Sequence, residues 1–253
     1  MKTVFALFAL SLCLFSSPLF AGLIFTLSDP DIAVGPAGAS NVETFDRQSR
    51  GRISDNIITD FGVYRALQGS VRINGANKWG GADGNGNYLF IPAGGAIELT
   101  FNNPVGYFGF WWSAGDAGNK LTVNTVSETL EFTTSDILNS PALTPEHFGN
   151  PFWGNPDSRD DYHASWEPFA FVNLFAETGA DSLTSIRFYG SNFESDNHTV
   201  LTTILPSSGA FISRVGIQSV PEPSAIALIS FALLLMYRKA QKRYAVAPKL
   251  GTH

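Results

Sequence analysis

The strongest constraint on the fold is the alternation of short aromatic and β-branched stretches with clusters of Gly, Asn, Asp and Pro. No window of helical length in the body of the chain carries an apolar stripe with a 3.6-residue period. We therefore expect strands at 61–67, 70–74, 87–91, 96–101, 105–113, 120–125, 128–134, 169–176, 183–190, 199–205 and 210–217. Their regular spacing favours antiparallel pairing, because parallel strands would need crossover helices. The predicted fold class is all-β, an antiparallel β-sandwich or jelly roll over residues 42–218.

The stretch GYFGFWWS within 105–113 is aromatic on both of its faces. Alternation places Phe108, Phe110 and Trp112 on one side and Tyr107 and Trp111 on the other. Such a pattern predicts a central strand that is buried on both faces. The alternative is that an indole of this strand is exposed as a stacking platform for a sugar ring.

A long segment, 135–168, interrupts the strand pattern and is dense in Pro and Asn. It is also rich in aromatic residues, Trp153 and Trp166 among them, which is unlike a solvated linker. We expect a long loop inside one domain. The candidate glycan platform therefore comprises Trp112, Trp153 and Trp166.

The N-terminus has the features of a secretory signal peptide. Met1 and Lys2 precede an apolar run of twelve residues, and a small residue, Ala21, ends the segment. The run is too short for a membrane anchor, so we expect residues 1–21 to be removed and 22–41 to lead into the sandwich. The only cysteine, Cys13, lies in the removed part, so the mature chain has no thiol for a disulfide, a nucleophile or a zinc site.

The body between residues 22 and 220 is acidic, with 10 Lys and Arg against 21 Asp and Glu. A chain without a basic stripe is not expected to bind nucleic acid, because phosphate binding depends on clustered positive charge. Carboxylates favour cations instead, and Ca²⁺ is the cofactor that we consider.

Two segments carry oxygen ligands of the type that calcium uses. In GGADGNGN, the side chains of Asp83, Asn85 and Asn87 alternate as in the first half of a calcium loop, but Tyr88 and Gly94 stand where an EF-hand needs Gly and Glu. In FESDNHTV, Glu194 and Asp196 precede the strand expected at 199–205. An ordinary Gly-Asn turn is the favoured explanation of the first segment, and turn formation also explains the second.

Motifs of catalysis are lacking. The sequence contains no GxSxG, HExxH, P-loop or strand–helix GxGxxG pattern. Three histidines, His147, His163 and His198, are scattered among expected loops. We interpret each as a surface turn residue rather than a catalytic base. We therefore expect a body that is not an enzyme, although a pair of glycosidase carboxylates is compatible with so many acidic residues.

The C-terminal part has three pieces in a fixed order: Pro221-Glu222-Pro223, an uncharged run at 225–237, and the basic residues Arg238, Lys239, Lys242 and Arg243. As a helix the run would be about 20 Å long, short of a hydrocarbon core of about 30 Å. Snorkelling basic residues make a span feasible, with the positive end in the cytoplasm and the body outside. The two prolines hold Glu222 in an extended, accessible stretch.

This tail, 219–243, resembles the PEP-CTERM sorting signal of exosortase-dependent surface proteins, and GFWWSAGD, EPFAFVNLFAE and GSNFESDNHTV resemble segments of β-rich proteins that carry it. The last ten residues, 244–253, extend beyond the usual end of such a signal as a cytoplasmic tail. The resemblance implies that exosortase, a membrane-embedded cysteine transpeptidase, cuts near Pro221-Glu222-Pro223. It also implies an inner-membrane precursor in a Gram-negative cell, whose body reaches the cell surface or the medium, often beside exopolysaccharide.

Three hypotheses remain for the body. It is a non-catalytic surface or matrix protein, a lectin-like module that binds carbohydrate, or a secreted hydrolase that acts on glycans. Exposed tryptophans on a sheet face would favour the lectin, and two carboxyl groups that face each other across a cleft would favour the hydrolase.

Overall fold

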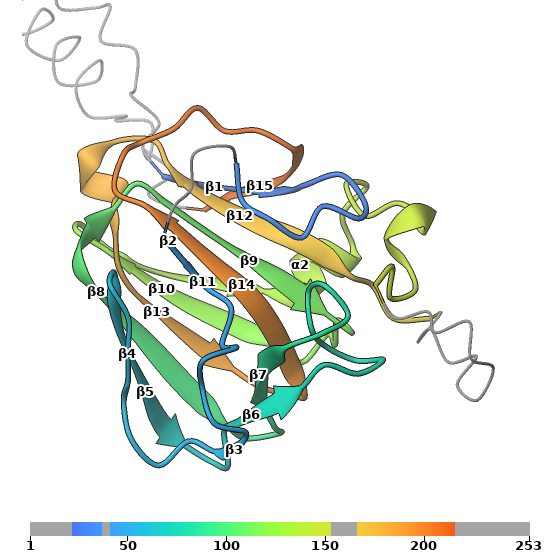
Figure 1. The fold of residues 1–253 in the computed structure, drawn as a ribbon. Helices are drawn as coiled ribbons and strands as arrows, with labels where there is room; N and C mark the ends of the chain where they lie inside the picture. Colours follow the sequence, from blue (N-terminus) through green and yellow to red (C-terminus); the bar gives the residue numbers. More distant parts are fainter. Residues whose placement is uncertain (1–21, 37–40, 153–165, 216–253) are drawn as a thin grey trace, which may run out of the picture. The chain divides into compact units, whose positions relative to one another are not determined.

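The computed structural model describes residues 22–36, 41–152 and 166–215, which pair into two antiparallel sheets (Figure 1). The larger sheet has nine strands in the order β15-β1-β12-β9-β14-β7-β6-β3, with β2 paired to β14. Their bounds are β15 Ala210–Val215, β1 Leu23–Leu27, β12 Ala170–Ala176, β9 Tyr107–Ser113, β14 Phe193–Leu201, β7 Asn87–Ile91, β6 Arg72–Gly75, β3 Gly51–Arg52 and β2 Asn41–Glu43. The all-β, antiparallel prediction is confirmed.

The smaller sheet has six strands in the order β11-β10-β13-β8-β5-β4. Their bounds are β11 Thr129–Thr133, β10 Lys120–Thr125, β13 Leu183–Tyr189, β8 Ala96–Val105, β5 Gly62–Gln68 and β4 Ile57–Ile58. A short helix, α2 Thr134–Leu138, follows β11, and single turns of 3₁₀ helix lie at Pro145–His147 and Gly179–Asp181.

The main core lies between the two sheets. The rings of Phe25 in β1 and Phe132 in β11 stack with centroids 3.9 Å apart, and Phe110 in β9 meets Phe188 in β13 edge to face at 5.7 Å. Contacts of this kind, in which rings from one sheet pack on rings from the other, are what hold a sandwich together.

The strand expected at 105–113 is β9, and all seven of its residues are buried. Its inner side chains belong to the core between the sheets, whereas Tyr107 and Trp111 belong to a second cluster with Phe169, Phe171 and Phe175. The second cluster lies on the outer face of the nine-stranded sheet, since the alternation along β9 and β12 divides the two clusters. The prediction of a central strand buried on both faces is therefore confirmed.

The structure differs from the sequence-based boundaries at several places, and two of these differences change the interpretation of a segment. The segment 22–41 is more than a lead-in, because its residues 23–27 form β1, which pairs with both β12 and β15. The strand expected to start at 199 starts at Phe193, so the polar run FESDNH lies inside β14.

In the described ranges no helix is long and apolar enough to cross a membrane. The predicted signal peptide at 1–21 and the sorting signal at 219–243 lie outside those ranges.

Candidate functional site

The strand β14 places polar side chains on both faces of the nine-stranded sheet. Phe193 points into the core, and the alternation puts Glu194 on the outer face. The register with β9 then slips between Asp196 and Thr199, with Asn197 at a φ of 48°. This bulge allows Ser195 and His198, three residues apart, to face the core together, where their side chains are 2.9 Å apart.

His198 is fully buried, which corrects its interpretation as a surface turn residue. Its Nδ1 lies 2.9 Å from the Tyr64 hydroxyl and its Nε2 lies 2.9 Å from the Ser195 hydroxyl. Burial lowers its pKa to about 3, so the ring is neutral and both nitrogens are satisfied. His147 is buried as well, and His163 lies outside the described residues.

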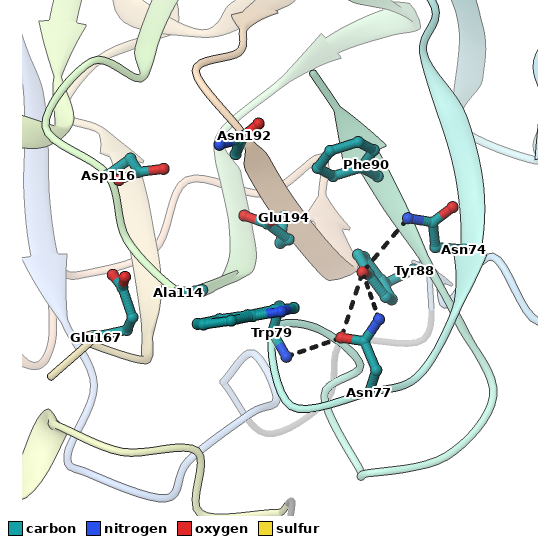
Figure 2. A pocket seen from close by; sticks show the side chains of 10 residues that line it. All are labelled: Asn74, Asn77, Trp79, Tyr88, Phe90, Ala114, Asp116, Glu167, Asn192 and Glu194. Atoms are coloured by element: carbon teal, nitrogen blue, oxygen red, sulfur yellow. Dashed lines mark hydrogen bonds between the residues drawn. The ribbon is translucent and has the colours of Figure 1, made fainter. Parts of the chain in front are cut away.

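The outer face of the sheet carries a pocket of about 410 Å³ at the ends of β6, β7, β9 and β14 (Figure 2). Ten residues line it: Asn74, Asn77, Trp79, Tyr88, Phe90, Ala114, Asp116, Glu167, Asn192 and Glu194. Its size is within the range of pockets that hold small organic ligands, roughly 300–1,000 Å³. Aromatic, amide and carboxyl groups therefore come together from six separate segments of the chain.

Three carboxyl groups form one side of the pocket. In Figure 2 the side chains of Asp116, Glu167 and Glu194 point toward the same space from the turn after β9, the segment before β12 and the start of β14. The pKa of Glu194 is raised to about 9, mainly by burial, and the neighbouring Asp116 and Glu167 contribute to the shift. Burial is also the main cause of the raised pKa values of Asp116 and Glu167. Like charges in a partly dry space favour the protonated form of the most buried member, Glu194.

Glu194 is 5% exposed, and its Oε2 atom has no hydrogen-bond partner among the described residues. A buried polar atom without a partner costs about 1–3 kcal/mol, which a folded protein rarely tolerates without a reason. The orphan atom belongs to a pocket-lining side chain, so a ligand hydroxyl could supply the missing bond.

The opposite side of the pocket is built around Trp79. The Asn77 side-chain oxygen accepts hydrogen bonds from the backbone N–H groups of Trp79 at 2.8 Å and Gly80 at 3.2 Å, which fixes the turn. The Asn77 amide nitrogen donates to the Tyr88 hydroxyl at 3.2 Å. Gly80 is required here because a Cβ would lie 2.6 Å from the Tyr88 ring. These bonds fix the backbone of the turn, from which the Trp79 indole extends along the pocket as an aromatic surface (Figure 2).

Two pocket residues have a backbone conformation that L-amino acids rarely adopt. Ala114 has a φ of 44° and Asn192 has a φ of 63°. Asn is often found in this region, but for Ala it costs about 1–2 kcal/mol. Strain of this kind is concentrated at ligand-binding sites, because the surrounding structure holds a geometry that the local sequence does not prefer.

The predicted glycan platform is corrected in part. Trp112 is fully buried in the core between the sheets, so it cannot stack on a ligand. Trp153 lies outside the described residues. Trp166 is 57% exposed and contacts Trp79 edge to face at 6.2 Å, which places it at the rim of the pocket. Trp79 itself was missed, because a single Trp between two turns carries no periodic signal.

The structure separates the residues of the first calcium candidate. Asp83 and Asn85 are exposed, whereas Asn87 is buried and points elsewhere. The Asn87 side-chain oxygen accepts from Arg50 Nε at 2.7 Å, and its amide donates to the Gln48 carbonyl at 3.1 Å. Asn87 therefore holds β7 to the turn after β2 and is not free to join its two neighbours around an ion.

The second calcium candidate is part of a strand rather than a turn. Glu194 lines the pocket, while the Asp196 carboxyl accepts from the backbone N–H groups of Ala82 at 2.9 Å and Asn197 at 2.7 Å. The pKa of Asp196 is raised to about 8, mainly by burial and to a lesser extent by Asp46 and Asp83. Over the described part of the chain, no three His, Asp or Glu side chains are grouped as metal ligands. Calcium binding stays a prediction, to be tested by thermal melts in millimolar calcium and in chelator.

The residues of the sorting signal, Pro221, Glu222, Pro223, Arg238, Lys239, Lys242 and Arg243, lie outside the described ranges. No family model matches the sequence, and no curated protein matches it. One solved structure with some likeness is the catalytic domain of a GH87 alpha-1,3-glucanase in complex with tetrasaccharides, with 12% identity and a TM-score of 0.28. The likeness covers 64% of this chain and 30% of that one, and at this TM-score it supports no inference about function.

Proposed function

We propose that the protein is an exported surface protein, processed by exosortase, whose β-sandwich binds a saccharide in the pocket on the outer face of the nine-stranded sheet. The observation that carries this proposal is that an indole, Trp79, lines a pocket of about 410 Å³ together with amide and carboxyl groups. A sugar ring has a C–H face that packs on an aromatic surface and hydroxyl groups that pair with amides and carboxyls. In an exported protein with a sorting signal, the cell's own exopolysaccharide is the natural ligand to test.

Binding is tested with the protein as cells release it, titrated with purified exopolysaccharide and its oligosaccharides. Trp79→Ala should weaken binding at least tenfold, because the aromatic surface of the pocket is lost. Phe211→Ala is the matched control, since Phe211 is 58% exposed and lies on β15, the edge strand at the other end of the sheet order. Equal affinities of the two variants would contradict the assignment of the pocket.

Export and sorting are tested by mass spectrometry of the surface fraction. The mature protein should lack residues 1–21 and everything beyond the Pro221-Glu222-Pro223 region. Replacing Pro221 and Pro223 with Ala should leave the body attached to the inner membrane through the helix expected at 225–237. Recovery of an intact C-terminal segment from shed protein would count against processing by exosortase.

Hydrolysis of the bound glycan is a second candidate, favoured by the three carboxyl groups that point into one space (Figure 2). A protonated Glu194 could donate its proton to the glycosidic oxygen, and an ionised Asp116 or Glu167 could activate water or attack the anomeric carbon. Release of reducing ends from the exopolysaccharide, abolished by Glu194→Gln, would establish it. If Glu194→Gln and the wild type are both inactive while binding persists, the site is a binding site only.

A further inference from the structure

The Glu194 side chain is the most informative group in the pocket. It is 95% removed from solvent, one of its oxygens has no partner in the described part of the chain, and Figure 2 shows it pointing into the space that Asp116 also faces. An ionised carboxylate at this place would face two other acids and would lack a paired cation. A neutral carboxyl group, in contrast, has one O–H that can donate a hydrogen bond to a ligand oxygen.

We propose that the pocket selects an uncharged, hydroxyl-rich saccharide unit and holds it through the protonated form of Glu194, so that ionisation of this one group releases the ligand. This inference rests on the proposed function and names the chemistry of its ligand. The carboxyl O–H donates to a hydroxyl, ring or glycosidic oxygen of the sugar, and the carbonyl oxygen accepts from a second hydroxyl.

The charges around Glu194 exclude an acidic ligand. The ten lining residues include two further acids, Asp116 and Glu167, and no cation. Two positive groups lie on the surrounding elements: Lys78, whose Nζ lies 4.6 Å over the Trp79 ring, and Arg72, opposite Phe90 in the β6–β7 register. A uronate or a sulfated sugar would therefore meet net repulsion in the pocket.

The groups that face Glu194 also determine how binding responds to pH. Glu194 is paired with Ser113 on β9 and Phe90 on β7, and neither side chain titrates in this range. Tyr88 also lies on β7, and burial raises its pKa above 10. Asp116 and Glu167 have pKa values raised by burial, but Glu194, at about 9, is the pocket-lining acid with the most displaced pKa. Arg72 and Lys78 are the cations, and neither is among the lining residues.

Asp196 is a second acid on β14 whose pKa burial raises into this range. Its pKa is about 8, and it lies on the same strand and face. It does not line the pocket, and its carboxyl is used by the backbone N–H groups of Ala82 and Asn197. Asp196→Asn is therefore the control that separates the two acids.

The test measures the affinity of the protein released by cells for neutral oligosaccharides of glucose, galactose and mannose at pH 7 and pH 10. Matched oligouronates are titrated alongside. Neutral probes should bind about tenfold more weakly at pH 10, because about nine tenths of Glu194 is then ionised. Oligouronates should not bind at either pH. Tighter binding of the neutral probes at pH 10 than at pH 7 would indicate that the ionised carboxylate holds the ligand and would overturn the inference.

Three variants complete the experiment. Glu194→Gln keeps a neutral donor and acceptor, so it should bind at pH 7 and lose the dependence on pH, whereas Glu194→Leu should not bind at either pH. Asp196→Asn should keep the wild-type dependence. Circular dichroism at pH 10 verifies that each protein is folded.

The two proposals fail in different ways. If neutral probes bind, with an affinity that Trp79→Ala reduces, but the affinity is constant from pH 7 to pH 10, the saccharide site stands and the role of Glu194 is wrong. If neither the probes nor the exopolysaccharide bind at pH 7, the proposed function falls and this inference falls with it.

Discussion

Two buried titratable side chains on β14 lie four residues apart and face opposite sides of the sheet. His198 faces the core and has a partner for each ring nitrogen, Tyr64 and Ser195. Glu194 faces the outer pocket and leaves one oxygen without a partner in the described chain. The hydrogen bonds of His198 are complete within the protein. Glu194, in contrast, has an oxygen that a bound ligand can pair with.

The comparison extends to the surroundings of the two residues. The ring of His198 lies against Phe45, Phe108 and Phe188, in a close-packed core that has no need of a ligand. Glu194 borders a cavity in which two residues have strained backbones and three acids face one another. The packed inner face stabilises the fold. The outer face carries backbone strain and buried acids, which lower stability and are typical of functional sites.

The largest effect should come from the inner face. Phe110→Ala should lower the free energy of unfolding by roughly 3–5 kcal/mol, because it opens a cavity among Phe108, Phe188 and Phe193. Phe90→Ala, at the half-buried edge of the pocket, should cost about 1 kcal/mol. Urea denaturation of both variants decides the matter, and equal losses would remove the distinction between the two faces.

The next effect should have the opposite sign. Glu194→Gln should stabilise the protein by about 3 kcal/mol at pH 7, because the wild-type carboxyl is protonated when folded, with a pKa of about 9, and ionised when unfolded. Because the pKa of Glu194 is higher in the folded than in the unfolded protein, its contribution to the free energy of unfolding is complete below about pH 4.5. That contribution is lost as the pH rises toward 9. The gain should therefore vanish near pH 4.

Urea denaturation at pH 4 and pH 7 measures this change. The control is Glu131→Gln, an exposed carboxylate paired with Lys120 at 2.8 Å, where a change under about 1 kcal/mol is expected. If Glu194→Gln were less stable than the wild type at pH 7, Glu194 would have a structural partner and the comparison with His198 would fail.

His198 should show the reverse dependence on pH. His198→Gln should cost about 2 kcal/mol at pH 7, since it disturbs the bonds to the Tyr64 and Ser195 hydroxyls. The folded pKa, about 3, is below the ordinary value of 6.5, so the contribution of the neutral ring is present above pH 6.5 and is lost as the pH falls. At roughly 1.4 kcal/mol per pH unit, the wild type should lose its advantage over the variant near pH 5. A constant difference between pH 7 and pH 5 would show that the pKa of His198 is not lowered in the folded protein.

Local sequence patterns were sufficient to predict most of the strands but insufficient to predict the pocket. The segments 87–91 and 120–125 are β7 and β10 to the residue, because each is an apolar and β-branched run bounded by turn residues. The start of β14 was missed since FESDNH is polar, and its burial depends on Tyr64, which is 134 positions from His198. Pairing over such a distance leaves no local signal.

The pocket was hidden for a related reason. Its lining comes from six segments between Asn74 and Glu194, and each segment alone resembles an ordinary turn or strand end. Glu194 was a candidate ligand on account of its acidic neighbours, yet its importance comes from the burial that the fold imposes. The alternation in β9 correctly separated Trp111 from Trp112 and predicted that both are buried, but it did not indicate which residues cover the outer indole.

The smallest effect concerns one methyl group on each face. Ala170 in β12 is buried in the core between the sheets, so Ala170→Gly should cost roughly 1–2 kcal/mol through the lost methyl contact and the greater freedom of glycine when unfolded. Ala114 is equally buried but has a φ of 44°, and relief of about 1–2 kcal/mol of backbone strain should offset those losses. Ala114→Gly should therefore leave the free energy of unfolding within about 0.5 kcal/mol of the wild type. Urea denaturation of the two variants side by side measures the difference. A loss at Ala114 as large as that at Ala170 would mean that the turn beside Asp116 is not strained, and the outer face would then differ from the core through Glu194 alone.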